Sequence, residues 1–134
     1  MTFQLHQNLK KKILLCDLDL CCVLLEDEKN YPWIILVPKR LNASKIMDLN
    51  FEDQIQLLKE MDFVQKIMWK EFNPTQLNVA AIGNKTSQLH IHVIARHVND
   101  LAWPNTVWDH PIKNKYDDEQ KKLIVLKLKA LLEK

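Results

Sequence analysis

Two histidines separated by one residue are the clearest chemical feature of this sequence. The segment Gln88–Arg96 reads QLHIHVIAR and predicts a β-strand, because apolar and polar residues alternate along it. Side chains two residues apart in a strand point to the same face, so Gln88, His90, His92 and Arg96 are expected to share one face. A neutral imidazole is a good nucleophile toward phosphorus, and a second imidazole can donate a proton to an oxygen at the same centre. The pair therefore permits phosphoryl-transfer chemistry.

A single glycine, Gly83, lies seven residues before His90. Two interpretations stay open: a tight turn that needs positive φ, or a backbone that must come close to a ligand. With Asn84, this turn could direct backbone N–H groups and a side-chain amide at phosphate oxygens. Arg96, on the histidine face, could lend positive charge to a polyphosphate.

The His-x-His spacing also fits other roles. It could be half of a zinc site that a cysteine or His97 completes, or the two side chains could simply lie on a solvent-exposed face. The sequence has no CxxC motif and no second spaced histidine pair to supply the missing ligands. We therefore expect no metal and no cofactor.

The strands that must position these residues are short and apolar. Leu18–Leu25 and Tyr31–Val37 predict a hairpin joined by the turn at Glu26–Asn30. Leu77–Ile82 predicts a further strand just before Gln88–Arg96.

Two helices are expected beside these strands. Phe51–Phe72 has apolar residues at steps of three and four, with Asn50 as its N-cap and Asn73-Pro74 at its end. Asp117–Glu133 predicts a C-terminal helix capped by Asp117, and we expect its inward residues to include Leu123, Leu126 and Ala130. Strands packed beside two helices indicate an antiparallel α+β domain.

Composition limits the class of protein. The chain has 134 residues, which suits one domain, and its net charge of +2 is too weak for a nucleic-acid coat or a basic membrane anchor. No stretch approaches the roughly 20 apolar residues needed to cross a bilayer. Three cysteines, Cys16, Cys21 and Cys22, in a chain without a signal peptide favour a cytoplasmic location, where they act as small buried hydrophobes.

Several segments together resemble the histidine triad (HIT) family. QLHIHVI resembles its motif, with Gln88 at the first histidine position and His90 and His92 at the second and third. YPWIILVPKR, LNVAAIGN and AWPNTVW resemble other segments of the family, and the combination looks most like bacterial members described as diadenosine polyphosphate hydrolases. The resemblance implies one HIT-like domain over residues 1–134. Its fold would be α+β, with a five-stranded antiparallel sheet, a long helix and a C-terminal helix.

The resemblance also implies catalytic roles. His90 would attack the α-phosphate and form a nucleotidyl-histidine that water then hydrolyses, while His92 would contact the phosphate and help the leaving group. Gln88 replaces the histidine that orients the others; its amide can still form hydrogen bonds but cannot carry a proton charge.

Binding residues follow from the same resemblance. Asn84 and Gly83 would lie at the phosphate loop, Asp27 would bind the ribose hydroxyls, and Leu25 would line the base pocket. The counterpart of Trp103 in the family reaches the site of the partner subunit.

We therefore expect a hydrolase or transferase acting on dinucleoside polyphosphates, such as diadenosine tetraphosphate, or on nucleoside phosphoramidates. The alternative is a nucleotide-binding or sensing module with little turnover, which the glutamine at position 88 motivates. The resemblance implies a homodimer that uses the long helix, and we expect neither nucleic acid nor a membrane as a partner.

Overall fold

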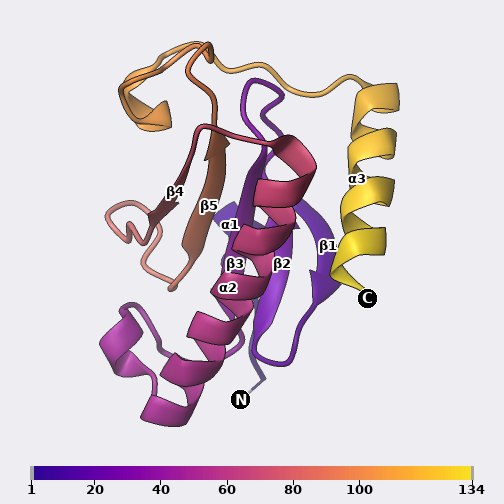
Figure 1. The fold of residues 1–134 in the computed structure, drawn as a ribbon. Helices are drawn as coiled ribbons and strands as arrows, with labels where there is room; N and C mark the ends of the chain where they lie inside the picture. Colours follow the sequence, from indigo (N-terminus) through magenta and orange to yellow (C-terminus); the bar gives the residue numbers. More distant parts are fainter. Residues whose placement is uncertain (1, 134) are drawn as a thin grey trace.

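The computed structural model describes residues 2–133, in which five strands form one antiparallel sheet with the order β1-β2-β3-β5-β4 (Figure 1). The strands are β1 (Ile13–Asp17), β2 (Cys21–Leu25), β3 (Trp33–Pro38), β4 (Gln76–Ala80) and β5 (Ile91–Arg96). The predicted five-stranded antiparallel sheet and α+β class are confirmed, including the hairpin of β2 and β3. Strand β1, at one edge of the sheet, was not predicted as an element.

The long helix α2 (Phe51–Phe72) has the predicted bounds. The Asn50 side chain accepts a hydrogen bond from the Asp53 N–H, and Asn73 ends the helix in the left-handed conformation with φ of 45°. The C-terminal helix α3 (Asp118–Leu132) begins after the predicted cap, Asp117. The shorter helices are α1 (Gln7–Lys10) and the 3₁₀ turns η1 (Ile46–Asp48) and η2 (Val107–Asp109).

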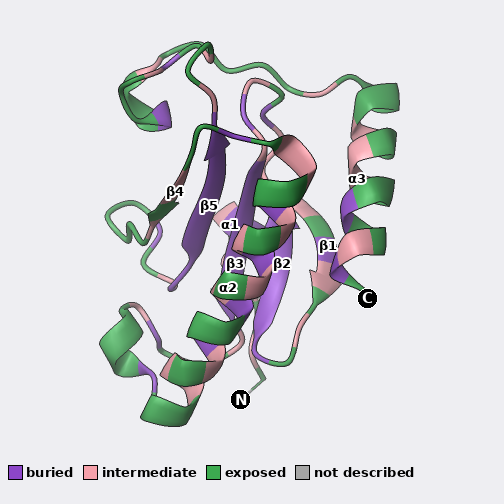
Figure 2. Cartoon of the chain, in the orientation of Figure 1, coloured by how far each residue is buried: buried purple, intermediate pink, exposed green. Residues whose placement is uncertain are grey.

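The central strands are covered on both faces, and Figure 2 shows that β2, β3 and β5 are buried along their length. Helices α2 and α3 pack over one face and enclose the main core (Figure 1). A smaller core lies on the opposite face, where Leu9 of α1 and Val107 of η2 pack on Trp33, Ile35 and Ile94. Helix α1 and the turn η2 therefore cover part of the face that carries the histidines.

The predicted inward face of the C-terminal helix is wrong. Leu123, Leu126 and Ala130 are exposed in α3, and the residues that reach the core are Leu128 and Leu132, with Ile124 and Val125 packed against it. This helix has apolar residues around most of its circumference, so more than one apolar stripe can be drawn along it. The predicted stripe is one of these, but a different one packs against the sheet.

In α2, the first half of the apolar stripe also faces away from the core. Phe51 is 80% exposed, and Ile55 and Leu58 are exposed as well, whereas Val64 and Met68 are buried. The N-terminal half of α2 thus presents an apolar surface that this chain does not cover.

Cys21 and Cys22 are buried and Cys16 is half-buried, and all three are free thiols. Among the helices within residues 2–133, none combines the length and the apolar character that a bilayer span requires. The cytoplasmic location stays a prediction.

Candidate functional site

His90 and His92 lie next to each other on the same side of the sheet, as predicted. Their ring centroids are 5.0 Å apart, and both side chains are largely buried. β5 begins only at Ile91, so His90 lies just before the strand and not within it. The alternation of faces nevertheless holds, because Leu89, Ile91 and Val93 point into the main core.

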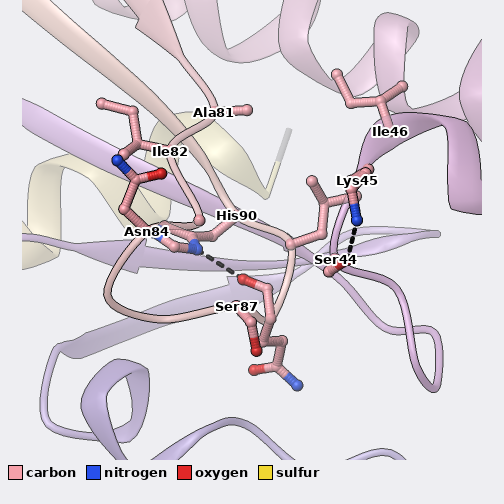
Figure 3. Close-up of a pocket in the computed structure, with 11 residues that line it drawn as sticks. Ser44, Lys45, Ile46, Ala81, Ile82, Asn84, Ser87 and His90 are labelled. Atoms are coloured by element: carbon pink, nitrogen blue, oxygen red, sulfur yellow. Dashed lines mark hydrogen bonds between the residues drawn. The ribbon is translucent and has the colours of Figure 1, made fainter.

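The ring of His90 has a defined tautomer. Its Nδ1 lies 2.7 Å from the carbonyl oxygen of Gln88, drawn as a dashed line in Figure 3. A carbonyl oxygen only accepts hydrogen bonds, so Nδ1 of His90 must carry the proton. In the neutral ring Nε2 then holds a free lone pair, which is the form that attacks an electrophile.

The ring of His92 has the opposite tautomer. The Nε1–H of Trp33 donates to Nδ1 of His92 over 2.9 Å, so Nδ1 is the unprotonated nitrogen and the proton lies on Nε2. Burial lowers the pKa of His92 to about 3, and the nearby His90 and Lys12 act in the same direction. His92 is therefore neutral at physiological pH and offers an N–H donor.

Trp108 completes an aromatic group around His92. Its ring meets the rings of His92 and Trp33 edge to face, at centroid distances of 5.0 and 5.6 Å. Trp108 belongs to η2, far along the chain from β5, so neither tryptophan was predicted as a site residue.

Two cavities meet at His90. One, of about 450 Å³, extends toward Ser44 and Lys45; Figure 3 shows Asn84 and Ile82 across it from these residues. The other, of about 430 Å³, also contains His92, Trp33 and Trp108 in its lining. Each lies within the range of about 300–1,000 Å³ typical of ligand sites. His90, Asn84 and Ile82 line both cavities, so a ligand could extend from one to the other past the His90 ring.

The second cavity is strongly basic. Its lining includes Lys11, Lys12, Lys85 and Lys113, against one acidic residue, Glu26, which pairs with Lys12. None of the ion pairs found within residues 2–133 involves the other three lysines. Such a lining favours an anion with several charges, although the net charge of the whole chain is small.

The side chain of Gln88 has a different role from the predicted one. Its Oε1 accepts from the backbone N–H of His6 over 2.8 Å, and its Nε2 donates to the carbonyl of Gln4 over 2.9 Å. It therefore binds the N-terminal segment and forms no hydrogen bond to either imidazole. Only the backbone carbonyl of Gln88 orients His90.

The N-terminal segment forms one wall of the basic cavity through Asn8, Leu9 and the two lysines that follow α1. Besides the bonds to Gln88, the Asn8 amide donates to the Thr86 hydroxyl over 3.0 Å. The loop after β4 and the N-terminal segment are thus held together beside the histidines.

Gly83 and Asn84 both line the first cavity, and of the two interpretations left open for Gly83 the turn with positive φ is excluded. A Cβ at Gly83 would meet no heavy atom closer than 3.8 Å. Neither conformation nor packing within the described residues requires glycine there, and close approach by a ligand stays a prediction.

The roles predicted for Leu25 and Asp27 are wrong by one position, because the residues directly before them lie on the histidine face. Leu25 lies in the main core on the face opposite the histidines, and Asp27 accepts from the Tyr116 N–H and pairs with Lys121. Leu24 lies in the smaller core on the histidine face, and Glu26 lines the basic cavity. A shift of one residue in a strand exchanges the two faces.

Arg96 and Trp103 do not line either cavity. The Arg96 guanidinium is buried, forms an ion pair with Asp100 at 2.8 Å and donates to Asn78, and lies over the rings of Tyr31 and Trp103. Burial would raise the pKa of Asp100, but hydrogen bonds from Arg96 and two backbone N–H groups outweigh it and lower that pKa. This buried pair fixes the start of the loop that carries Trp108 to the site.

A zinc site would need at least a third ligand beside His90 and His92. In the part of the chain from 2 to 133, no three histidine, cysteine or acidic side chains are grouped so that they could hold a metal ion.

Comparisons with known proteins agree with this arrangement. The model of the family described as HIT domain matches residues 7–99. A histidine triad protein from Marinobacter aquaeolei VT8 is 39% identical with a TM-score of 0.95, covering 99% of this chain and 98% of that chain. One from Bradyrhizobium japonicum is 37% identical, with a TM-score of 0.93 and coverages of 97% and 98%. One from Sinorhizobium meliloti 1021 is 32% identical, with a TM-score of 0.92 and coverages of 98% and 96%. No curated protein matches the chain.

Proposed function

Because the chain belongs to the HIT domain family, we propose that it is a hydrolase or transferase that breaks a bond at the α-phosphate of a nucleotide through His90. The observation that carries this proposal is the pair of opposite tautomers. His90 has a free lone pair on Nε2, whereas His92 has an N–H there, so one ring can attack phosphorus while its neighbour donates to a phosphate oxygen.

The reaction has two steps. In the first, Nε2 of His90 forms a bond to the α-phosphorus, and the bond to the leaving group breaks with its electron pair going to that group. The Gln88 carbonyl accepts from Nδ1–H and stabilises the positive charge that the ring gains. In the second step, water attacks phosphorus, the electron pair of the P–N bond returns to Nε2, and the proton of the water passes to solvent.

Dinucleoside polyphosphates and nucleoside phosphoramidates are the substrate classes we propose. The two cavities that meet at His90 support a substrate with a bulky group on each side of the reacting phosphorus. Glu26, in place of the predicted Asp27, supplies a carboxylate that could accept hydrogen bonds from ribose hydroxyls.

The alternative of a binding module with little turnover rested on Gln88. The side chain of Gln88 is bound to the N-terminal segment, and the His90 ring is oriented by a backbone carbonyl that any residue at position 88 would supply. This position therefore gives no reason to expect an inactive His90.

Rapid quenching during turnover of diadenosine tetraphosphate, followed by mass spectrometry, tests the proposal. We expect adenylate attached to the peptide that contains His90, and we expect His90→Ala to abolish both the adduct and the product. His97→Gln, beyond the other end of β5, is the matched control and should retain both. Tight nucleotide binding without product at high enzyme concentration would favour the binding module.

We also propose a homodimer. Ile46, Phe51, Ile55, Leu58 and Met61 line a shallow apolar depression on the uncovered half of α2, and a second copy of this chain is the occupant we propose.

A further inference from the structure

The indole of Trp33 is hydrogen-bonded to the ring of His92. Its Nε1–H is a donor only, and its partner in this buried contact is Nδ1 of His92, at 2.9 Å. An imidazolium would carry a proton on Nδ1 as well, and that proton would point at the indole N–H. The contact therefore excludes the charged ring unless Trp33 moves away.

The surroundings of His92 act in the same direction. Burial, His90 and Lys12 lower the pKa of His92 to about 3. The neutral ring can donate a hydrogen bond from Nε2, but it cannot transfer a proton as an imidazolium would. The other titratable groups that line the same cavity are His90, Lys11, Lys12, Glu26, Lys85 and Lys113.

Whether the reaction needs an acid at His92 depends on the leaving group. When an anhydride P–O bond breaks, the electron pair stays on an oxygen of a phosphate or polyphosphate, which is a stable anion near neutral pH. When a phosphoramidate P–N bond breaks, the pair goes to an amine nitrogen, which must take up a proton to leave. Lys11, Lys85 and Lys113 line the cavity that contains His92 and suit the anion.

We propose that Trp33 is a positioning residue that keeps His92 a hydrogen-bond donor and not an acid, and that the site thereby favours nucleoside polyphosphate anhydrides over phosphoramidates. The second half of this inference rests on the proposed function. The first half concerns only the protonation of the His92 ring. It can therefore be tested even if the protein cleaves no substrate.

Nuclear magnetic resonance of the ring nitrogens in the whole, ¹⁵N-labelled protein tests the first half. In wild type we expect His92 to show the tautomer with the proton on Nε2 from pH 8 to pH 5. In Trp33→Phe we expect this ring to exchange between tautomers or to titrate within that range. A wild-type His92 with the proton on Nδ1, or one that becomes charged near pH 6.5, would overturn the proposal even if the variant does not fold.

Kinetics with two substrates test the second half. General acid catalysis contributes about 10²–10⁴-fold, so we expect wild type to show a kcat/KM for diadenosine tetraphosphate at least about 10²-fold above that for adenosine phosphoramidate. In Trp33→Phe that ratio should fall by about tenfold or more at pH 6, with phosphoramidate cleavage rising as pH falls. Trp69→Phe, the same change at an exposed position of α2, should leave the ratio unchanged.

The outcomes separate the two proposals. Equal cleavage of both substrates by wild type, with a phosphoramidate rate that rises from pH 8 to pH 5, would overturn the inference while the proposed function survives. No cleavage of either substrate would overturn the proposed function and the preference with it, and the ring spectra would still decide the role of Trp33.

Discussion

The two histidines carry their protons on different ring nitrogens although only one residue separates them. A backbone carbonyl sets one tautomer and an indole N–H sets the other. Neither partner is itself titratable in the neutral range, so neither hydrogen bond changes through titration of the partner. A site of this kind can use two residues of one type for two distinct tasks.

At the residue scale, Gly83→Ala tests whether a ligand approaches the only glycine of the chain. The free energy of unfolding should stay the same or rise by about 0.4–1 kcal/mol, because φ is not positive and a methyl group meets no close neighbour. Binding of adenosine monophosphate, measured by calorimetry, should weaken by about tenfold, or 1.4 kcal/mol. Unchanged affinity would show that no ligand comes near this backbone.

Much of the site could be predicted from residue types and spacing, but not the partners of the rings. The shared face of His90 and His92 follows from the period of a strand. The position of Asn84 at the site follows from its place in the loop before that strand. Trp33, Trp108 and Lys113 reach the site from other elements, so only the pairing of strands and the course of the last loop bring them there. Leu25 and Asp27 were misplaced because the register across a hairpin turn cannot be read from a single sequence.

At the scale of elements, the N-terminal segment is a wall of the site that is attached by a few polar contacts. Helix α1 has only four residues, too few to be stable alone. Its position depends on Leu9 in the smaller core and on the hydrogen bonds that His6 and Asn8 donate to Gln88 and Thr86. The geometry of the basic cavity therefore depends on side chains that never touch the histidines.

Gln88→Ala should loosen this wall. Loss of two neutral hydrogen bonds should cost about 1–3 kcal/mol, at 0.5–1.5 kcal/mol each. Hydrogen exchange should become faster at the amides of residues 6–10, and KM should rise more than kcat falls. Gln7→Ala, at an exposed position of α1, is the control and should change none of these quantities. Slow exchange retained in Gln88→Ala would show that other contacts hold the segment.

Helix bounds were predicted better than helix faces. Capping chemistry marks α2 clearly, with Asn50 before it and Asn73 after it, and Asp117 does the same for α3. Which apolar stripe faces inward depends on the partner surface, so Leu126 was placed in the core although it is 71% exposed. β1 was missed because it is a short edge strand that follows three lysines and leaves Leu14 exposed.

At the scale of the whole molecule, the apolar half of α2 predicts self-association. Light scattering after size exclusion should give wild type twice the mass of one chain. Phe51→Glu combined with Leu58→Glu should give one chain mass, because two charges would be buried in the interface. Leu126→Glu, at an equally exposed apolar position on α3, should remain dimeric. A monomeric wild type at micromolar concentration would contradict the dimer.

The buried neutral His92 also predicts how stability depends on pH. Its pKa is about 3 in the folded protein against a usual 6.5, so the unfolded state takes up a proton that the folded state refuses. The free energy of unfolding should therefore fall as pH drops from 6.5 toward 3, by up to roughly 1.4 kcal/mol per pH unit from this group. Urea unfolding at pH 7.5, 6.0 and 5.0 should show a steeper loss for wild type than for His92→Gln, at one fixed protein concentration. Parallel pH dependence in the two proteins would mean that this ring is already protonated when folded.

The attachment of the chain's first residues to Gln88 has a practical consequence for anyone who purifies this protein. An affinity tag fused ahead of Met1 would add its residues only a few positions before the backbone groups of Gln4 and His6 that Gln88 binds. Such a fusion could distort catalytic assays without unfolding the protein. Assays should therefore use a cleavable tag, or a tag placed after α3.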